Sequence, residues 1–363
     1  MKQEQIINLV QRLINATGPC GEEKEIRDVF LRELEKVCDK CFADEAGNAI
    51  GLIKGKAGKG KAGRVRGSRP PVIQVMAHLD ENSLTVKRVE PDGTLRVKAF
   101  GGLFPWVLGL GPVEILGDEK ILPGVFSVGP MHVSQETPAP YKSMAKGEGK
   151  TLEWRQVYVI TRLTPDELSA AGVHAGTRVI IPRSRRALIQ LHDCVAGYFL
   201  DDRAGLAIML AAASMLREAK QKPANDVYLI GTCQEENGTG TAAYASARLP
   251  GNVAVMLDIG PAAAEYGVLL NREPVICYRD VTLHSKPVCD RLLSLGRRLG
   301  MKPQTAVWEN YGTDLGFASM VGHIAHTALL CMPAENTHGF EVAPKEGIES
   351  CARLLSAYLR EPV

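Results

Sequence analysis

The stretch VIQVMAHLDEN, residues 72–82, decides the fold, because it begins with an apolar run and ends in polar and charged residues. The run from Val72 to Ala77 predicts a strand that is buried on both faces, which is typical of a sheet covered by helices. Functional groups gather at the carboxyl ends of such strands. His78 and Asp80 follow the run directly, so we expect part of a functional site there.

Helical and strand patterns alternate on either side of this stretch. Apolar residues at helical spacing predict two helices at the start of the chain, and the later segments alternate between the two patterns. The predicted helices cover about 6–14, 22–37, 205–219 and 286–299, and the predicted strands cover 48–53, 225–236 and 252–260. This alternation predicts an α/β domain.

A different pattern occupies the middle of the chain. From about residue 84 to 193, short β-like runs such as TLRVKAF and GPVEILG are separated by glycine and proline. We interpret this part as a small β domain inserted into the α/β domain. The predicted divisions are 1–83 for the first part of the α/β domain, 84–193 for the insert and 194–363 for the second part. A chain of 363 residues is long enough for two cores.

The composition is that of an ordinary globular protein, with 45% hydrophobic and 23% charged residues. The formal net charge of +2 gives no general attraction to nucleic acid or to an anionic membrane, so we expect neither as a partner. Nine cysteines without paired spacing predict reduced thiols. The N-terminus lacks the apolar region of a secretory signal and no stretch is long enough to span a bilayer. We therefore expect a cytoplasmic protein.

One local exception is a segment rich in Lys, Arg and Gly at residues 54–69. It could bind nucleic acid or an acidic partner. We favour a solvated hairpin tip, because no aromatic residue stands between the basic residues to stack on bases.

Five short segments place carboxylates and imidazoles just after apolar runs. They are AHLDEN at 77–82, LDDRAG at 200–205, CQEENG at 233–238, MLDIG at 256–260 and NTHGF at 336–340. A single acidic residue after a strand is usually a helix cap or part of a solvated turn. Five such segments together point to a shared site.

The residue types in these segments are the ligands of zinc and similar divalent ions. Hydrolysis of an amide near neutral pH needs an activated water, a group that takes its proton, and positive charge to stabilise the oxyanion. Two neighbouring metal ions supply the activation and the positive charge. One shared carboxylate and two further ligands for each ion make a set of five Asp, Glu and His residues.

The chain resembles the M42 family of metallo-aminopeptidases over nearly its whole length. The family pattern is an HxD segment, an inserted β domain, a DDR segment, a pair of glutamates, a single Asp after a strand and a late His. The corresponding residues here are His78-Leu79-Asp80, Asp201-Asp202-Arg203, Glu235-Glu236, Asp258 and His338. The runs Pro123–Gly129 and Gly312-Thr313-Asp314 also resemble the family. The resemblance implies a three-layer αβα catalytic domain with a mixed central sheet, interrupted by a small β-barrel-like dimerisation domain.

The resemblance also implies a role for each residue. Asp201 would bridge two divalent metal ions, zinc or alternatively cobalt. His78 and Asp258 would complete one ion, and Glu236 and His338 the other. Glu235 would be the general base. The family further implies a cis peptide between Asp201 and Asp202.

Some roles can be argued from the residues themselves. Glu235 and Glu236 can serve one site only if they lie on an irregular turn, since adjacent residues of a strand point to opposite faces. No sequence rule decides which of the two is the base. Asp80 follows His78 by two positions, so its carboxylate can accept the second ring N–H and fix the tautomer, with a salt bridge or cap as the alternative. We expect Asp202 to cap the helix that begins near Arg203.

By resemblance we expect peptides with a free N-terminus as substrates, and a homo-oligomer that ranges from a dimer to a tetrahedral dodecamer. Two alternatives remain open. One is another binuclear hydrolase on the same catalytic fold, a carboxypeptidase or N-deacylase, although the β-rich insert argues against it. The other is a non-catalytic metal-binding relative, which would have lost a ligand or the base.

Overall fold

The computed structural model describes residues 1–56, 72–130 and 152–362, in which the chain forms two compact units. The larger unit comprises Met1–Glu81, Leu188–Thr337 and Glu341–Val363, and the smaller unit comprises Asn82–Ala187 with His338–Phe340. The chain leaves the larger unit after Glu81 and returns to it at Leu188. The boundaries predicted from the sequence were 84 and 193.

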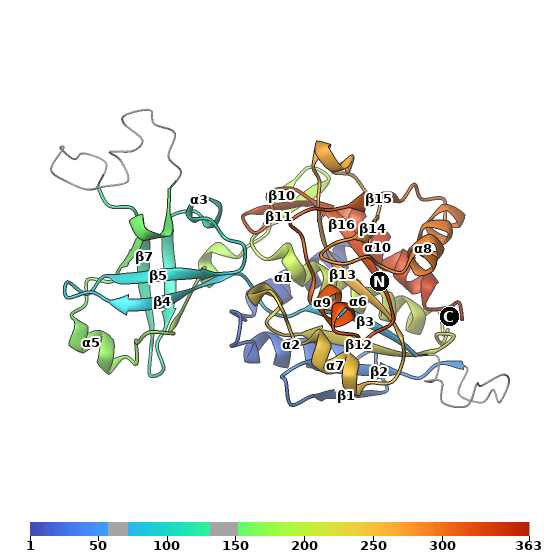
Figure 1. The fold of residues 1–363 in the computed structure, drawn as a ribbon, viewed down its shortest axis with the longest axis horizontal. Helices are drawn as coiled ribbons and strands as arrows, with labels where there is room; N and C mark the ends of the chain where they lie inside the picture. The colour runs from blue at the N-terminus through green and yellow to red at the C-terminus, as the bar shows by residue number, and fades with distance from the viewer. Residues whose placement is uncertain (57–71, 131–151, 363) are drawn as a thin grey trace. The chain divides into compact units, whose positions relative to one another are not determined.

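Among the described residues, the larger unit contains a mixed sheet of eight strands in the order β1-β2-β12-β3-β13-β16-β14-β15 (Figure 1). The four middle strands are parallel to one another, whereas β2 and β14 run antiparallel to β12 and β16. The strands are β1 Lys40–Ala43, β2 Ala49–Ile53, β3 Val72–His78, β12 Asp226–Thr232, β13 Val253–Pro261, β14 Val275–Arg279, β15 Gln304–Val307 and β16 His326–Ala334.

Helices cover both faces of this sheet. Ile73, Val75 and Ala77 of β3 belong to one buried apolar cluster and Met76 belongs to another, because successive strand residues point to opposite faces. The first cluster includes side chains of α1 Gln3–Asn15, α2 Lys24–Leu34, α6 Leu200–Glu218, α8 Lys286–Arg298 and α10 Lys345–Tyr358. The second includes those of α7 Ala242–Arg248 and α9 Asp314–Met320. The predicted three-layer αβα arrangement with a mixed sheet is confirmed.

The apolar run that precedes His78 forms β3, one of the middle strands of the sheet. All seven residues of β3 are buried, and the strand has a parallel neighbour on each side. Its register with β12 pairs His78 with Thr232. The polar segments that follow these strands are thereby brought to the same edge of the sheet.

A second, three-stranded sheet in the larger unit has the order β10-β11-β17. Its strands are β10 Ile189–Leu191, β11 Cys194–Gly197 and β17 Glu341–Pro344. Gly197 pairs with Glu341 in this sheet, which places Glu341 close to the start of α6.

The smaller unit is a closed β-barrel with the strand order β4-β5-β8-β7-β6-β9. Burial alternates along β7, as expected for a strand with one face in a core. A Cβ on Gly124 would lie 2.6 Å from Cγ1 of Val159, so a larger residue does not fit there. The elements are β4 Ser83–Val89, β5 Leu95–Phe100, α3 Pro105–Leu108, β6 Gly111–Leu116, β7 Ile121–Ser127, β8 Tyr158–Ile160, α5 Pro165–Ala170 and β9 Arg178–Ile180. The predicted barrel-like insert is confirmed.

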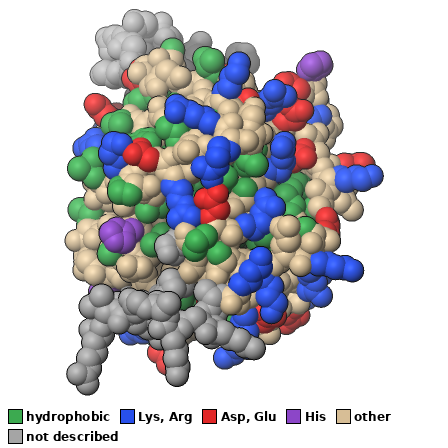
Figure 2. Space-filling model, turned by 90° about the vertical axis from the view of Figure 1, so that its right-hand side faces the viewer, with side chains coloured by type: hydrophobic (Ala, Val, Ile, Leu, Met, Phe, Trp, Pro, Cys, Tyr) green, Lys and Arg blue, Asp and Glu red, His purple; other side chains and the backbone are tan. Residues whose placement is uncertain are grey.

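Figure 2 shows one face of the molecule with its side chains coloured by type. Lys and Arg side chains are spread over that face with acidic and apolar side chains between them. Most of the basic segment 54–69 lies outside the described residues. Of the helices that the structure describes, none combines the length and the apolar character needed to cross a membrane.

Candidate metal centre

The parallel strands β3, β12 and β13 each deliver an acidic or imidazole side chain to one edge of the sheet. His78 is the last residue of β3, Asp258 lies near the end of β13, and Glu235 and Glu236 follow β12 by a few residues. Carboxyl ends of parallel strands meet at one edge, which explains why segments far apart in the sequence converge here.

The site opens where two of these strands separate. The ladder between β3 and β13 ends at the pair Met76 and Met256, two residues before His78 and Asp258. The main-chain N–H of His78 instead donates to Oδ2 of Asp202 at 3.3 Å. The start of α6 therefore enters the gap between the strands.

The first turn of α6 is built around a cis peptide between Asp201 and Asp202, as the family resemblance implied. Oδ1 of Asp202 accepts a hydrogen bond from the N–H of Gly205 at 3.0 Å, which is the helix cap expected from the sequence. A Cβ on Gly205 would lie 2.2 Å from that oxygen, so only glycine allows this close approach. Asp201 is fixed by its own N–H, which donates to Oε2 of Glu341 at 2.9 Å.

Glu235 and Glu236 lie on a 3-10 turn, Glu235–Asn237, as their shared site required. Gln234 precedes the turn with a positive φ of 60°. The N–H groups of Glu235 and Glu236 donate to Oδ1 and Oδ2 of Asp80, each at 3.0 Å. Asp80 therefore fixes both glutamates through their backbone.

Asp80 also contacts the imidazole of His78. Nδ1 of His78 lies 3.1 Å from the carbonyl oxygen of Asp80 and 3.6 Å from its Oδ1. The carbonyl is thus the nearer acceptor, whereas the sequence suggested the carboxylate. With Nδ1 engaged, the other ring nitrogen, Nε2, faces Oδ1 of Asp201 at 2.8 Å.

The described residues contain two overlapping groups of potential metal ligands at this edge. His78, Asp201 and Glu236 form one, and His78, Asp202 and Asp258 form the other. In each group the three ligand atoms lie within 4.8 Å of one another and the residues are buried. Four of the five predicted ligands are therefore brought together, and Asp202 joins them.

The fifth predicted ligand, His338, belongs to the smaller unit and to neither group. Nδ1 of its ring lies 3.2 Å from the carbonyl oxygen of Gly102, and the residue has a positive φ of 64°.

The carboxylates of the site are crowded and poorly solvated. Burial raises the pKa of Asp258 to about 8, and the negative charge of Asp201 adds to the effect. Burial also raises the pKa values of Glu235 and Glu236 well above their ordinary range. The charge of Glu236 adds to the effect on Glu235, and the charge of Asp201 adds to the effect on Glu236. For His78, burial by itself lowers the pKa, but the hydrogen bonds to Asp201 and Asp80 outweigh it and raise the pKa well above 6.5.

Bound divalent cations would stabilise the ionised form of these crowded carboxyl groups. Buried charges are stable only when they are paired or coordinate a metal. The nearby cation Arg203 is bound to Glu81 at 2.7 Å, with both side chains fully buried. A donor set of carboxylates and one imidazole suits zinc and similar ions. The residues present therefore fit a metal centre.

Sequence reasoning missed several residues that support this centre. Glu341 was given no role, and only the hydrogen bond from the N–H of Asp201 to its carboxylate reveals one. The hydroxyl of Tyr311 donates to the carbonyl of Ile259 at 2.6 Å, next to Asp258. Asp314, in the Gly-Thr-Asp run, is buried, and that burial raises its pKa to about 6.

Comparison with known proteins supports the same family. Lysyl aminopeptidase from Pyrococcus furiosus is 27% identical over 367 residues, which cover 97% of this chain and 96% of that protein. The solved structure of aminopeptidase APDkam598 from Desulfurococcus kamchatkensis matches with a TM-score of 0.83 and 25% identity, over 99% of this chain and 96% of that one. The TET1 peptidase of Pyrococcus horikoshii matches with a TM-score of 0.81 and 22% identity, over 98% and 99%.

The family model described as M42 glutamyl aminopeptidase matches residues 61–354. That range includes both ligand groups, the glutamate pair and the barrel. The chain belongs to the M42 family of aminopeptidases.

Proposed function

We propose that the chain is a binuclear metallo-aminopeptidase that removes N-terminal residues from peptides. Asp201 would be shared by two metal ions, zinc or cobalt. His78 and Asp258 would complete one ion, and Glu236 and His338 the other. The observation that carries the proposal is the pair of buried ligand groups that share His78 at the carboxyl edge of the sheet.

When bound, the ions would lower the pKa of the attacking water and stabilise the oxyanion. The remaining chemistry belongs to the chain. Glu235 is the general base: it takes the proton of the water and passes it to the leaving amine. Its half-buried position raises its pKa, which suits a group that must both accept and release a proton near neutral pH.

Other side chains hold these groups in place. Asp80 orients the imidazole of His78. It also accepts hydrogen bonds from the N–H groups of Glu235 and Glu236 in the 3-10 turn, which we call the glutamate turn. Glu341 holds the backbone of Asp201. The buried pair of Arg203 and Glu81 fixes the start of α6 against the segment that follows β3.

A panel of aminoacyl anilides tests the proposal. The native protein should hydrolyse anilides with a free amino group, and chelation should abolish turnover until metal is restored. Glu235→Gln should lower kcat by about 100-fold or more while both ions remain bound. The matched change Glu265→Gln, at an exposed acidic residue, should leave kcat unchanged.

Three results would contradict the proposal in different ways. Undiminished turnover by Glu235→Gln would remove Glu235 as the base. Equal cleavage of an N-acetylated anilide would point to another hydrolase class, such as an N-deacylase. Binding of two ions without hydrolysis of any substrate in the panel would indicate a non-catalytic relative.

We also propose that the protein acts as a homo-oligomer in the cytoplasm. The solved TET1 peptidase of Pyrococcus horikoshii is described as assembling into a tetrahedron or a large octahedral shell. In this chain, Phe104 and Trp106 of the smaller unit stack with their ring centroids 4.6 Å apart and are 54% and 49% exposed. Such a pair favours an interface between copies. Light scattering should report a dimer or larger assembly, and Phe104→Ser with Trp106→Ser should shift it toward smaller species.

A further inference from the structure

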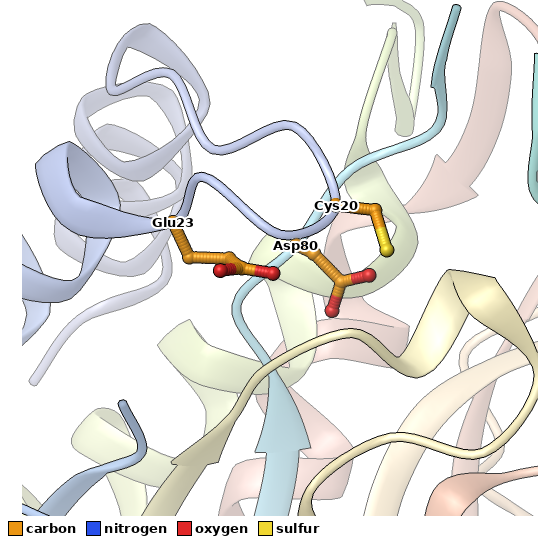
Figure 3. A group of neighbouring side chains, drawn as sticks. All are labelled: Cys20, Glu23 and Asp80. Carbon is orange, nitrogen blue, oxygen red and sulfur yellow. The ribbon is translucent and has the colours of Figure 1, made fainter. Parts of the chain in front are cut away.

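A third buried group of polar side chains, Cys20, Glu23 and Asp80, lies beside the glutamate turn (Figure 3). Cys20 and Glu23 come from the segment before α2, and Asp80 follows β3. The sulfur and the two carboxyl groups face one another in Figure 3. Their potential ligand atoms lie within 4.8 Å of one another, so at first sight the group resembles another metal site.

The oxygens of this group are directed at backbone N–H groups. Asp80 accepts from Glu235 and Glu236, as described above. Oε1 of Glu23 accepts from the N–H of Gly21 at 2.6 Å and from that of Gln234 at 3.2 Å. Two carboxylates thus hold three consecutive N–H groups, those of Gln234, Glu235 and Glu236.

This arrangement defines the shape of the turn. Gln234 has a left-handed conformation, which residues other than glycine adopt only when their surroundings impose it. The carbonyl of Gln234 accepts from the N–H groups of Asn237 and Gly240 at 3.3 and 3.1 Å, so only its N–H depends on a side chain from elsewhere in the chain. Glu23 is 6% exposed, which favours a fixed carboxylate.

We infer that Glu23 is a positioning residue that holds Gln234 and thereby aims the carboxylate of Glu235. The inference rests on the proposed function of Glu235. Asp80 fixes the turn from the side of the metal ligands, and Glu23 fixes it from the side of the N-terminal segment. A misplacement of about 1 Å at a reacting group can lower the rate by about 100-fold, so this second support has a kinetic effect.

The test compares Glu23→Met, Glu23→Gln and, as a matched control, Glu22→Met, which changes an exposed neighbouring carboxylate. Glu23→Met removes the acceptor and should lower kcat by about 10- to 100-fold, with KM within about twofold and two ions still bound. Glu23→Gln keeps an amide oxygen that can accept both N–H groups, so kcat should stay within about threefold of the native value. Glu22→Met should match the native protein.

Hydrogen exchange of the peptide that spans residues 230–240 supplies a readout that does not depend on activity. The N–H of Gln234 should exchange faster in Glu23→Met than in the native protein and in Glu23→Gln. If Glu23→Met does not fold, Glu23→Asp, which retracts the carboxylate by one methylene, should show the same faster exchange.

Native kcat and native exchange in Glu23→Met would overturn the inference. So would a Glu23→Gln variant as impaired as Glu23→Met, because the charge rather than the acceptor would then matter. If Glu235→Gln proves fully active, the proposed function fails, while the exchange measurement still decides whether Glu23 holds the turn.

Discussion

Nε2 of His78 lies 2.8 Å from Oδ1 of Asp201, and this contact raises the pKa of the imidazole in the protein without metal. A metal ion and a proton therefore compete for the same nitrogen. Zinc binding near pH 7 should release roughly one proton or more for each chain. Calorimetric titration in two buffers of different ionisation enthalpy measures this number.

Replacement of an exposed imidazole is the control for that measurement. His192→Ala removes a side chain that is 97% exposed, so proton release should not change. Proton release should fall in His78→Ala. The same zinc-binding enthalpy in both buffers would show that no proton is released, which would contradict the competition between metal and proton.

The raised pKa of Asp258 should make the stability of the metal-free protein depend on pH. Its pKa is raised from an ordinary value of 3.8 to about 8, chiefly by burial. A group with a higher pKa in the folded chain stabilises the fold fully below its unfolded pKa, and this stabilisation is lost as the pH rises through the folded value. The Tm of the metal-free protein should therefore fall between about pH 5 and about pH 8. Thermal unfolding in the presence of a chelator measures this fall, and Asp258→Asn should make it shallower. An equally steep fall of Tm in Asp258→Asn would show that Asp258 is not the group responsible for it.

Gly205 is expected to tolerate no side chain, because a Cβ would lie 2.2 Å from Oδ1 of Asp202. Gly205→Ala should destabilise the fold by about 1–3 kcal/mol and weaken metal binding. The control is Ala207→Gly at a buried position of the same helix, which should cost about 1–2 kcal/mol through helix propensity and the lost methyl group and leave metal binding unchanged. Denaturant unfolding and zinc titration measure both effects. If Gly205→Ala binds metal with native affinity, Gly205 does not support the metal site.

The buried pair of Arg203 and Glu81 should show strong coupling. Removing either partner leaves a buried charge, so Glu81→Leu alone should destabilise the protein by about 3–5 kcal/mol. Adding Arg203→Met should recover part of that loss, because no unpaired charge remains. A double-mutant cycle in urea measures the coupling, and additive effects of the two changes would show that the pair acts independently.

Much of the fold could be predicted from the sequence, because local patterns specify its elements. The run before His78 predicted the central strand, and the alternation of helices and strands predicted the layers. Four of the five predicted ligands lie close together for a related reason, since parallel strands carry the residues at their carboxyl ends to one edge.

The supporting contacts could not be predicted, because they depend on packing between distant segments. Nothing in the sequence near Glu23 or Glu341 distinguishes these residues from ordinary surface glutamates. Their roles follow from partners 211 and 140 positions away. The acceptor for Nδ1 of His78 was likewise decided by backbone geometry that the residue spacing does not encode.

The route of the chain between His78 and Asp201 affects how much the length of the intervening chain can vary within the family. The two residues are 123 positions apart, and most of the intervening chain forms the smaller unit, which starts at Asn82 and rejoins the larger unit at Leu188. The entropy of closing a loop grows slowly with its length, by about 0.6 kcal/mol for each doubling. Insertions or deletions in the barrel strands should therefore change little in the free energy of bringing His78 and Asp201 together. Evolution can remodel that part of the chain while the hydrolytic chemistry stays the same.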